Sequence, residues 1–344
     1  MLFGVTSLTS LTSLSSEYQA ATEACGLVNR SPRGKLALTG SQAKSFLQGQ
    51  VTNDVEALSS GAGCYAAFLT PKGKMLGDLR ILDASLQQVA RSASGLAGQG
   101  DAGAVQLLLL DTERVALQEL FNLIRRFSIG YDAQLHKRTT QSGLVSLIGP
   151  ASGPAAGATE LPEIEHAHLL GELHGVSVRM IRTDLGVDLL CEADDTARLL
   201  SELAARDVPT VSDSVAECVR IEHGRPRYGI DLDDGVIPQE AGLNERAVSF
   251  TKGCYVGQET VARLYYRGKP NRHLRGLRLA EPVPAGAEVS FGGRPVGRVT
   301  SVSHSPALGP IALAFIRREA PPGLAVDVGP DAISAEVVEL PLRR

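Results

Sequence analysis

After Pro270 the chain consists of short strand-like segments, and this limits the folds that it can adopt. The segments EVSF, RPVGRVTSV, PIALAFIRR and LAVDV alternate apolar and polar residues, and Gly/Pro turns separate them. No helical period occurs among them. Short alternating strands joined by turns are typical of a small all-β barrel or sandwich. We therefore expect residues 271–344 to form a C-terminal β-barrel.

The preceding residues mix helix and strand patterns. KLALTG alternates as a strand, and SQAKSFLQGQV follows as a helix with Ser41 as its N-cap. CYAAFLTPKGKMLGDLRIL contains two strand-like runs joined by residues 71–74, which predicts a hairpin. VQLLLLD predicts a buried strand, and TERVALQELFNLIRRF predicts a helix with Thr112 as its cap. We therefore expect residues 17–270 to form an α+β body.

Two segments lack such patterns. Residues 1–16 contain the repeat TSLTSLTSL and have too little bulk to pack, so we expect a poorly ordered N-terminal segment. Residues 91–104 are rich in Gly, Ala and Ser, which predicts a loose loop or an insertion.

Charge and hydropathy exclude several classes of protein. The 344 residues include 34 Lys plus Arg against 38 Asp plus Glu, which gives a net charge of -4. This balance is ordinary and lacks the overall basic character of a nucleic-acid coat protein. No apolar run approaches the roughly 18 residues that span a bilayer. The N-terminus has no basic residue before Arg30 and does not resemble a secretory signal. We expect a cytoplasmic protein that does not bind membranes.

Known metal and nucleotide motifs are also missing. The five cysteines form no C-x-x-C pair and no Cys/His cluster with the spacing of a metal site. We therefore expect reduced thiols, no metal and no iron–sulfur cluster held by this chain's own cysteines. His166, His168 and His174 lie beside a flexible connector, and we expect surface histidines there. The sequence contains no P-loop, no G-x-G-x-x-G and no G-x-S-x-G.

The stretch TKGCYVGQETVAR, residues 251–263, is the first candidate site. A free thiol titrates near pH 8.5, and a nearby cation or helix N-terminus favours the thiolate. Lys252 lies two residues before Cys254, and a helix-forming run follows. Gly253 and Gly257 would let the backbone approach a ligand closely. The spacing is equally compatible with a buried, inert cysteine beside a solvated lysine.

The stretch RIEHGRPRYGIDL, residues 220–232, is the second candidate. A carboxylate such as Glu222 can accept two parallel hydrogen bonds from a flat donor edge, for example that of a pterin. The alternative is a surface salt bridge from Glu222 to Arg225 or Arg227.

A basic cluster is the third candidate. It interleaves two tyrosines with positive charges and contains no acid: Arg263, Tyr265, Tyr266, Arg267, Lys269, Arg272, His273, Arg275 and Arg278. We interpret it either as a solvated basic face or as a surface for an anion, such as a polyanionic tail or RNA.

Together these segments resemble a known family. KGCYVGQETVAR resembles the K-G-C-[FY]-x-G-Q-E motif of YgfZ-type folate-binding proteins, which are related to the glycine-cleavage T-protein, an aminomethyltransferase. LTGSQAKSFLQGQVTNDV, CYAAFLTPKGKMLGDLRI, RIEHGRPRYGIDL and RPVGRVTSVSHSPALGPIALAFI resemble further family segments in the same order. The resemblance covers approximately residues 17–328.

This resemblance implies a fold and a ligand. The fold would be a T-protein-like α+β body of two intertwined halves around a central channel, followed by the β-barrel. Tetrahydrofolate, or a one-carbon derivative of it, would bind in the channel. The resemblance places Glu222 at the pterin and Asn53 and Asp54 in the segment that shapes the site.

It also assigns roles to the cysteine motif. Lys252 and Cys254 would be the functional pair that marks the YgfZ branch. The neighbouring motif positions would contribute to the folate site: Gly253, Gly257, Gln258 and Arg263.

The hairpin departs from the T-protein pattern N-x-x-G-G-x-x-D-D. The matching positions are Thr70, Gly73, Lys74, Gly77 and Asp78, so one aspartate of the pair is a glycine. Aminomethyl transfer needs a carboxylate to orient or protonate the reacting groups. The T-protein lacks the K-G-C motif, which points instead to a task that uses the thiol.

Three functional hypotheses follow. The first is a folate-binding accessory protein for iron–sulfur cluster assembly or repair, with client enzymes or assembly factors as partners and an influence on tRNA modification. The second is a tetrahydrofolate-dependent aminomethyl- or methyltransferase that uses Asp78 as its catalytic carboxylate. The third is a non-enzymatic module that binds tRNA or a protein partner through residues 263–278.

Overall fold

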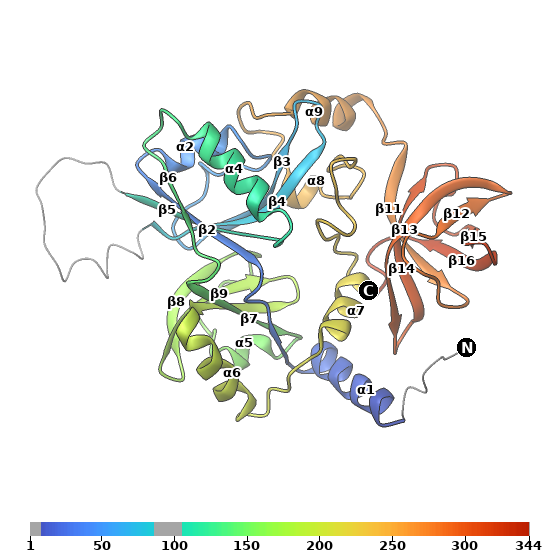
Figure 1. Ribbon diagram of the computed structural model, residues 1–344, viewed down its shortest axis with the longest axis horizontal. Coiled ribbons are helices and arrows are strands. Elements are labelled where there is room, and N and C mark those ends of the chain that lie inside the picture. The colour runs from blue at the N-terminus through green and yellow to red at the C-terminus, as the bar shows by residue number, and fades with distance from the viewer. Residues whose placement is uncertain (1–7, 86–104, 344) are drawn as a thin grey trace, which may run out of the picture.

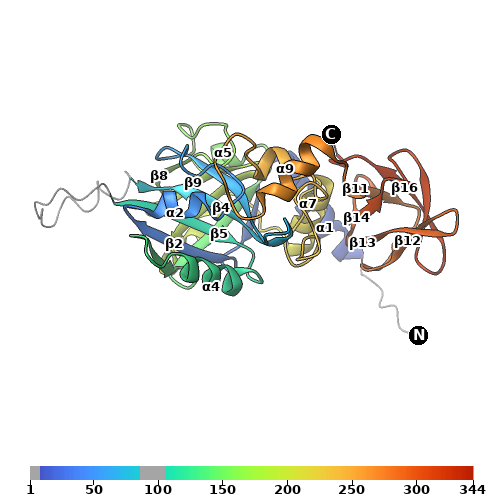
Figure 2. The same cartoon turned by 90° about the horizontal axis from the view of Figure 1, so that it is seen from above.

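The computed structural model describes residues 8–85 and 105–343 as two five-stranded sheets, connecting helices and a closed barrel (Figure 1). The segment 91–104, predicted as a loop, lies outside the described residues, as do residues 1–7. No helix in the described ranges is long and apolar enough to cross a membrane. Figure 2 shows the sheets at one end of the molecule and the barrel at the other.

The first sheet has the strand order β1-β7-β10-β9-β8, and all neighbours are antiparallel. Its strands are β1 (Gly26–Asn29), β7 (Ser142–Ile148), β8 (His168–Leu173), β9 (Val176–Thr183) and β10 (Gly186–Glu192). The helices α5 (Ser152–Ala155), η1 (Ala193–Asp195) and α6 (Thr196–Ala204) lie against this half. Alternate residues such as Val145, Leu147, Val187 and Leu189 pack with α6 in one apolar core.

The second sheet has the order β3-β4-β5-β2-β6. Its strands are β2 (Gly34–Gly40), β3 (Gly63–Leu69), β4 (Met75–Asp83), β5 (Gln106–Thr112) and β6 (Gln134–Lys137). The helices α2 (Ala43–Gln48) and α4 (Leu117–Phe127) cover one face. Leu79 and Ile81 of β4 pack on that face, so Asp78, Arg80 and Leu82 point to the opposite one.

The two sheets are intertwined along the chain. After β1 the chain forms the whole second sheet and then returns, so that β7 pairs with β1. The predicted hairpin is confirmed as β3–β4, with Gly73 at φ 76° in its turn. The predicted caps are wrong. The Ser41 hydroxyl donates to Asp132 instead of capping the helix. Thr112 is the last residue of β5, and its hydroxyl donates to the backbone carbonyl of Asp78.

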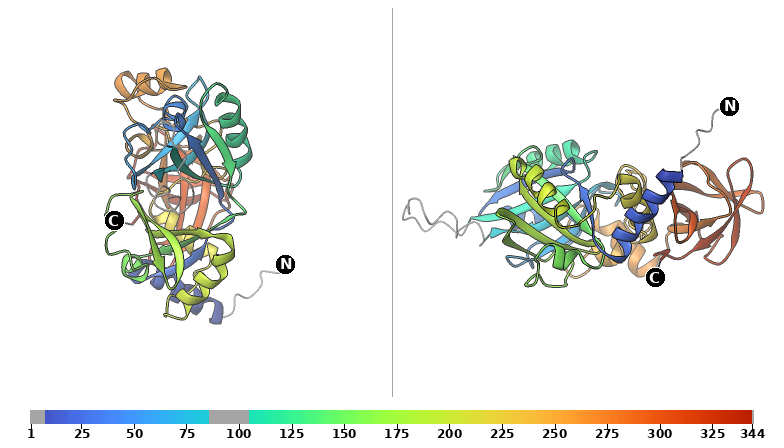
Figure 3. Two further views of the ribbon diagram at one scale, coloured as in Figure 1. Left: turned by 90° about the vertical axis from the view of Figure 1, so that its left-hand side faces the viewer. Right: turned by 90° about the horizontal axis from the view of Figure 1, so that it is seen from below.

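Helices connect the sheets to the barrel: α1 (Leu8–Glu23), α7 (Asp213–Glu222), α8 (Asn244–Ala247) and α9 (Gln258–Arg267). α1 begins at Leu8 and therefore includes residues that the sequence assigns to the N-terminal segment. Apolar residues of α1 and α7, including Tyr18, Ala21 and Val215, pack together beside the first sheet. Figure 3 shows α1 running along this junction.

The predicted C-terminal β-barrel is confirmed. Six strands close in the order β11-β14-β13-β12-β15-β16. They are β11 (Arg272–Leu279), β12 (Glu288–Phe291), β13 (Arg294–Ser305), β14 (Gly309–Arg317), β15 (Ala325–Val328) and β16 (Ile333–Val338). Leu277, Val289, Ala312 and Val337 are fully buried inside it.

Glu222, at the end of α7, forms hydrogen bonds with residues from distant parts of the chain. Its Oε1 accepts hydrogen bonds from Tyr18 Oη of α1 (2.8 Å) and from Ser305 Oγ, the last residue of β13. Its backbone carbonyl accepts the N–H of Leu342 (2.8 Å). The surface salt bridge from Glu222 to Arg225 or Arg227 does not form, because both arginines pair with other carboxylates.

We expect Ser305→Ala to lower the free energy of unfolding by about 1–3 kcal/mol, because it removes one donor from a fully buried carboxylate. Ser334→Ala, on the exposed side of β16, is the matched control and should change this energy by less than about 0.5 kcal/mol. Urea denaturation of both variants measures the difference. Equal stability of the two variants would contradict the role assigned to Glu222.

Candidate functional site

A polar cavity of about 210 Å³ lies where the inner faces of the two sheets meet. Because side chains alternate along a strand, Asp78 and Arg80 of β4 face Ser146 of β7 and Asp188 of β10 across it. Loops and the elements β3, β5, α7 and α8 supply the remaining charged and aromatic lining: Arg30, Arg33, Tyr65, Asp111, Glu113, Glu165, His166, Asp184, Arg220, Arg225, Arg227, Tyr228 and Arg246.

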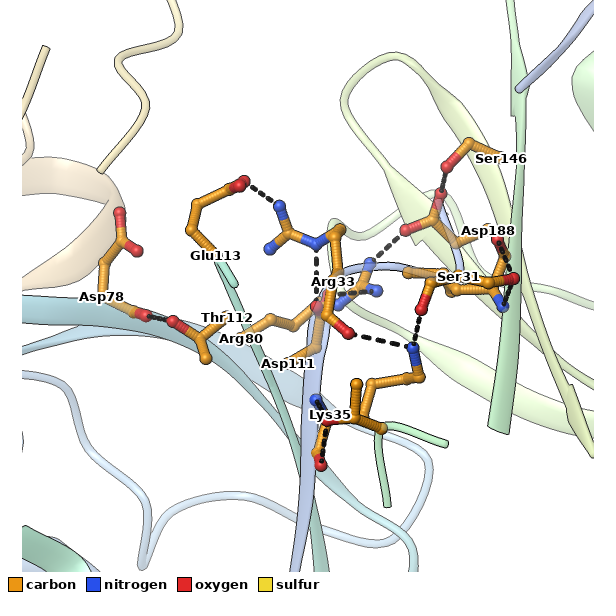
Figure 4. A network of polar contacts seen from close by, with 12 residues as sticks. Ser31, Arg33, Lys35, Asp78, Arg80, Asp111, Thr112, Glu113, Ser146 and Asp188 are labelled. Atoms are coloured by element: carbon orange, nitrogen blue, oxygen red, sulfur yellow. Dashed lines mark hydrogen bonds and ion pairs between the residues drawn. The ribbon is translucent and has the colours of Figure 1, made fainter. Parts of the chain in front are cut away.

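Arg80 bridges the two sheets at the floor of this cavity (Figure 4). Its Nη1 lies 2.6 Å from Asp188 Oδ2 in the first sheet, and its Nη2 lies 2.8 Å from Asp111 Oδ2 in the second. Ser146 Oγ donates to the other oxygen of Asp188. Burial alone would lower the pKa of Arg80, but the two carboxylates raise it overall. The guanidinium therefore stays charged while almost fully buried.

A second set of ion pairs continues around the cavity. Arg33 Nε lies 2.8 Å from Asp111 Oδ1, and its Nη1 pairs with Glu113. Glu113 also pairs with Arg227 (3.2 Å). Burial raises the pKa of Asp111, whereas the neighbouring cations Arg33 and Arg80 lower it. The net result is a pKa below the usual value. Most of the cavity carboxylates are thus already paired with arginines.

Asp78 differs from these paired carboxylates. The structure gives it no ion-pair partner among the described residues, and its Oδ2 accepts a short hydrogen bond from Tyr65 Oη. Burial raises the pKa of Asp78 to about 6, although Tyr65 and Arg33 favour the carboxylate. A group that titrates near neutral pH inside a cavity can accept or donate a proton.

The glycine at position 77 does not remove a cavity carboxylate. Gly77 faces the opposite side of β4, where an added Cβ would lie 3.0 Å from the side chain of Leu120 in α4. A side chain there would enter the apolar core. Of the two positions in the T-protein pattern, only Asp78 lines the cavity.

A second cavity of about 250 Å³ lies beyond Arg80 and Asp111, which line both cavities. The same strands supply mainly leucines here, including Leu82, Leu109 and Leu190. The space between the sheets therefore has a charged part and an apolar part, separated by the Arg80 bridge.

The prediction of surface histidines is wrong for two of the three. His168 is buried and its Nδ1 lies 2.9 Å from Arg179 Nη1. His166 lines the cavity with its backbone at φ 69°, and burial lowers its pKa to about 4. The loop that carries His166 is held by a backbone hydrogen bond to Arg182 of β9. This tertiary contact leaves no signal in the local sequence.

Lys252 is buried and does not act on the surface. Its Nζ donates to the carbonyls of Gln48 (2.6 Å), Val51 (2.8 Å) and Asn53 (2.8 Å). Three bonds satisfy all three ammonium donors. Burial lowers the pKa of Lys252 to about 8. The lysine of the K-G-C motif therefore holds the loop 48–53 that precedes β3.

Asn53 and Asp54 stabilise that same loop. The Asn53 amide donates to the carbonyls of Tyr65 (2.9 Å) and Arg246 (3.2 Å), whose side chains line the cavity. Asp54 Oδ1 accepts from Gln48 Nε2 (3.0 Å). Neither Asn53 nor Asp54 lines the cavity itself.

Cys254 is exposed, and it lies outside the lining of the central cavity. Gly257 starts α9 at φ 85°, and an added Cβ would lie 2.6 Å from the carbonyl of Thr70 in the hairpin turn. Gly253 has no atom within 4 Å of an added Cβ. Gln258 is half-buried and Arg263 is exposed. The structure thus places the motif on the outer side of the body.

Aromatic residues on either side of the motif in the sequence contact one another. The rings of Phe250 and Tyr265 stack with centroids 3.8 Å apart, and Tyr266 meets Tyr265 edge-on. Arg263, Arg267 and Lys269 are exposed next to them. The predicted cluster is not wholly free, because Arg272 pairs with Glu240 (3.1 Å) and Arg275 with Glu339 (2.8 Å).

Glu222 lies outside the lining of either cavity between the sheets. Its side chain is fully buried among α1, α7 and β13, as described above. The structure therefore brings only Asp78, of the predicted site residues, into the central cavity. Across the described ranges 8–85 and 105–343, no group of three or more His, Cys, Asp and Glu side chains could hold a metal ion.

This arrangement agrees with comparisons to known families. Residues 9–252 match the GCVT N-terminal domain, and residues 272–342 match the glycine cleavage T-protein C-terminal barrel domain. The chain belongs to the glycine cleavage T-protein family. The expected T-protein-like α+β body with a C-terminal barrel is thereby confirmed.

Two similar proteins illustrate the relationship. The chain is 27% identical over 326 residues to "Putative transferase At1g60990, chloroplastic" of Arabidopsis thaliana, which covers 92% of this chain and 70% of that protein. It also resembles the crystal structure of glycine cleavage system aminomethyltransferase T from Bartonella henselae, with a TM-score of 0.79 and 20% identity. That match covers 95% of this chain and 88% of the other, and it shows the shared fold.

We expect Asp78→Asn to change how stability depends on pH. The folded pKa of Asp78, about 6, lies above the unfolded value of about 3.9, so its contribution to stability is present below pH 4 and lost as the pH rises through 6. The stability of wild type relative to the variant should fall by up to about 3 kcal/mol between pH 4 and pH 7. Denaturation across this range measures it, and parallel pH profiles would contradict the assigned pKa.

We expect Lys252→Met to lower the free energy of unfolding by about 2–4 kcal/mol, because three backbone carbonyls lose a charged donor. Lys269→Met, which changes an exposed lysine, should stay within about 0.5 kcal/mol of wild type. Thermal and urea denaturation compare the two. Unchanged stability of the Lys252 variant would show that the loop does not depend on its ammonium.

Proposed function

We propose that the central cavity binds tetrahydrofolate or a one-carbon derivative of it. The chain belongs to the T-protein family, and the cavity lies between the intertwined halves of the body. Concave sites with a few convergent polar groups at such an interface are the usual places for small ligands.

The chemistry of the lining fits a reduced folate. A pterin has a flat ring with a donor edge, and Tyr65 and Tyr228 supply aromatic surface while Asp78 supplies an acceptor. A folate also carries carboxylates, which suit a cavity rich in guanidinium groups. When bound, the folate would supply or accept a one-carbon unit. Asp78, with its pKa of about 6, would hold a proton at the pterin or release it.

We propose further that the protein is of the YgfZ type and serves iron–sulfur proteins as an accessory factor. The observation that carries this proposal is the exposed thiol of Cys254, which lies outside the lining of the central cavity. A thiol at the surface can reach a client protein, whereas one inside the cavity could not. Lys252 would act as a positioning residue, because its ammonium is committed to the loop carbonyls.

The alternative is a tetrahydrofolate-dependent one-carbon transferase, and the orientation of Asp78 favours it. Asp78 faces the cavity while Gly77 faces the core, so the cavity keeps a carboxylate despite the glycine. The Arabidopsis relative is named a transferase. In this hypothesis Asp78 carries the reaction and Cys254 is dispensable.

The exposed surface of α9 would contact the macromolecular partner, whether that partner is an RNA or a protein. Its exposed Arg263, Arg267 and Lys269 lie beside the aromatic rings of Tyr265 and Tyr266. Positive charges interleaved with aromatic rings suit single-stranded nucleic acid, such as a tRNA loop. We retain tRNA as a candidate partner on this ground, with iron–sulfur clients as the principal proposal.

Calorimetry with 5-formyltetrahydrofolate tests the folate site. Wild type and Cys254→Ser should bind with the same affinity, because Cys254 lies outside the cavity. Asp78→Ala should weaken binding at least about tenfold, since it removes a buried hydrogen-bond acceptor. No binding to wild type would overturn the folate proposal.

Recovery of a damaged iron–sulfur enzyme in extracts lacking this protein then separates the two functions. An accessory factor should fail with Cys254→Ser, although that variant still binds the folate. In a separate assay of one-carbon transfer from the folate, a transferase should fail with Asp78→Asn and work with Cys254→Ser. Cys254→Ser supporting full recovery would contradict the role proposed for the thiol.

A further inference from the structure

One arginine of the central cavity lacks a carboxylate partner in the described parts of the chain, although the other arginines of the lining are all paired, some of them with carboxylates outside the lining. Seven guanidinium groups line the cavity against six carboxylates. Six of the seven form ion pairs with carboxylates: Arg33, Arg80, Arg220, Arg225, Arg227 and Arg246. Among the residues that the structure describes, Arg30 has no carboxylate within ion-pair distance.

The carboxylates of the cavity are not available to Arg30. Asp111 and Asp188 are held by Arg80, and Glu113 is shared by Arg33 and Arg227. Asp184 and Glu165 pair with Arg225 and Arg246. The remaining carboxyl, Asp78, accepts the Tyr65 hydroxyl.

Arg30 is half-buried, and other cations lie close to it. Burial lowers the pKa of its guanidinium, and nearby Arg33 and Arg227 lower it further, against the attraction of Asp188 and Glu113. A desolvated cation without a counter-ion is costly, and a bound anion would relieve that cost.

Two other arginines of the lining each have one donor without an acceptor. The Nε atoms of Arg80 and Arg220 have no acceptor among the described residues, and each can only donate. Both atoms are enclosed by protein, so Arg30 is the unpaired group on which the assignment rests.

We propose that Arg30 forms an anion subsite of the central cavity and binds an oxyanion group of the ligand, a carboxylate or a phosphate. Either group can present two oxygens that a guanidinium holds with two parallel hydrogen bonds. This inference rests on the proposed function only in taking the central cavity as the ligand site. It adds that the ligand must carry a negative charge there.

Two sources could supply this oxyanion. One is a carboxylate of the folate's glutamate, and the other is a free phosphate or a phosphate ester. Calorimetry on the full-length protein with four probes separates them: 5-formyltetrahydrofolate, p-aminobenzoyl-L-glutamate, 6-methyltetrahydropterin and inorganic phosphate. The third probe carries the pterin without any carboxylate.

The variants are Arg30→Gln, Arg30→Lys and the control Arg125→Gln, which changes an exposed arginine of α4. For a carboxylate subsite, Arg30→Gln should weaken the two glutamate-bearing probes at least about tenfold. Arg30→Lys should lose less, because it keeps the charge. Binding of the tetrahydropterin should be unchanged in all three variants.

The outcomes distinguish this inference from the proposed function. In one outcome, wild type binds phosphate but no folate, and Arg30→Gln abolishes that phosphate binding. This result would support the anion subsite and overturn the folate proposal. Folate binding equal in wild type and Arg30→Gln would keep the folate site and overturn the inference. Failure of wild type to bind any anionic probe would also overturn it.

A stability measurement excludes a purely structural role for Arg30. Because Arg30 has no ion-pair partner in the described chain, Arg30→Gln should leave the free energy of unfolding unchanged or higher without ligand. Urea denaturation in a buffer free of phosphate and carboxylates measures it. A clear loss of stability would show that Arg30 supports the fold instead, and it would overturn the assignment.

Discussion

Arg80 joins the two intertwined halves of the body, because its guanidinium pairs with Asp111 in one sheet and Asp188 in the other. Removing one partner of such a buried pair commonly costs about 3–5 kcal/mol, since it leaves an uncompensated charge. The same three side chains form the floor of the charged cavity and divide it from the apolar one. The interaction that fixes how the sheets meet therefore also sets the shape and charge of the candidate ligand site.

The K-G-C motif separates into two roles. Lys252 builds the loop 48–53 from inside, and through Asn53 that loop contacts the backbone of two cavity residues, Tyr65 and Arg246. Cys254, two residues later, is exposed and lies outside the cavity lining. A single short motif thus contains both a buried lysine that supports the cavity wall and an exposed thiol. This division is consistent with a protein that binds a ligand in one place and meets a partner in another.

The sequence predicted the parts of the fold that depend on local patterns. Alternating strands and turns after Pro270 predicted the barrel, and the residues around Gly73 predicted the β3–β4 hairpin. The cavity could not be predicted in this way, because Arg30, His166 and Arg246 come from segments far apart in the chain. Only Asp78 among the predicted residues lines it. Glu222 and Lys252 were recognised as special, but their partners depend on tertiary packing that spacing does not encode.

The central claim is that the cavity between the two sheets is the folate site. Amide hydrogen exchange of the full-length protein, with and without saturating 5-formyltetrahydrofolate, tests it most directly. We expect slower exchange in β4, β5 and β10 and in residues 225–228, which line the cavity, and no change in α9. Protection confined to α9, or no protection in the cavity strands at saturation, would contradict the account.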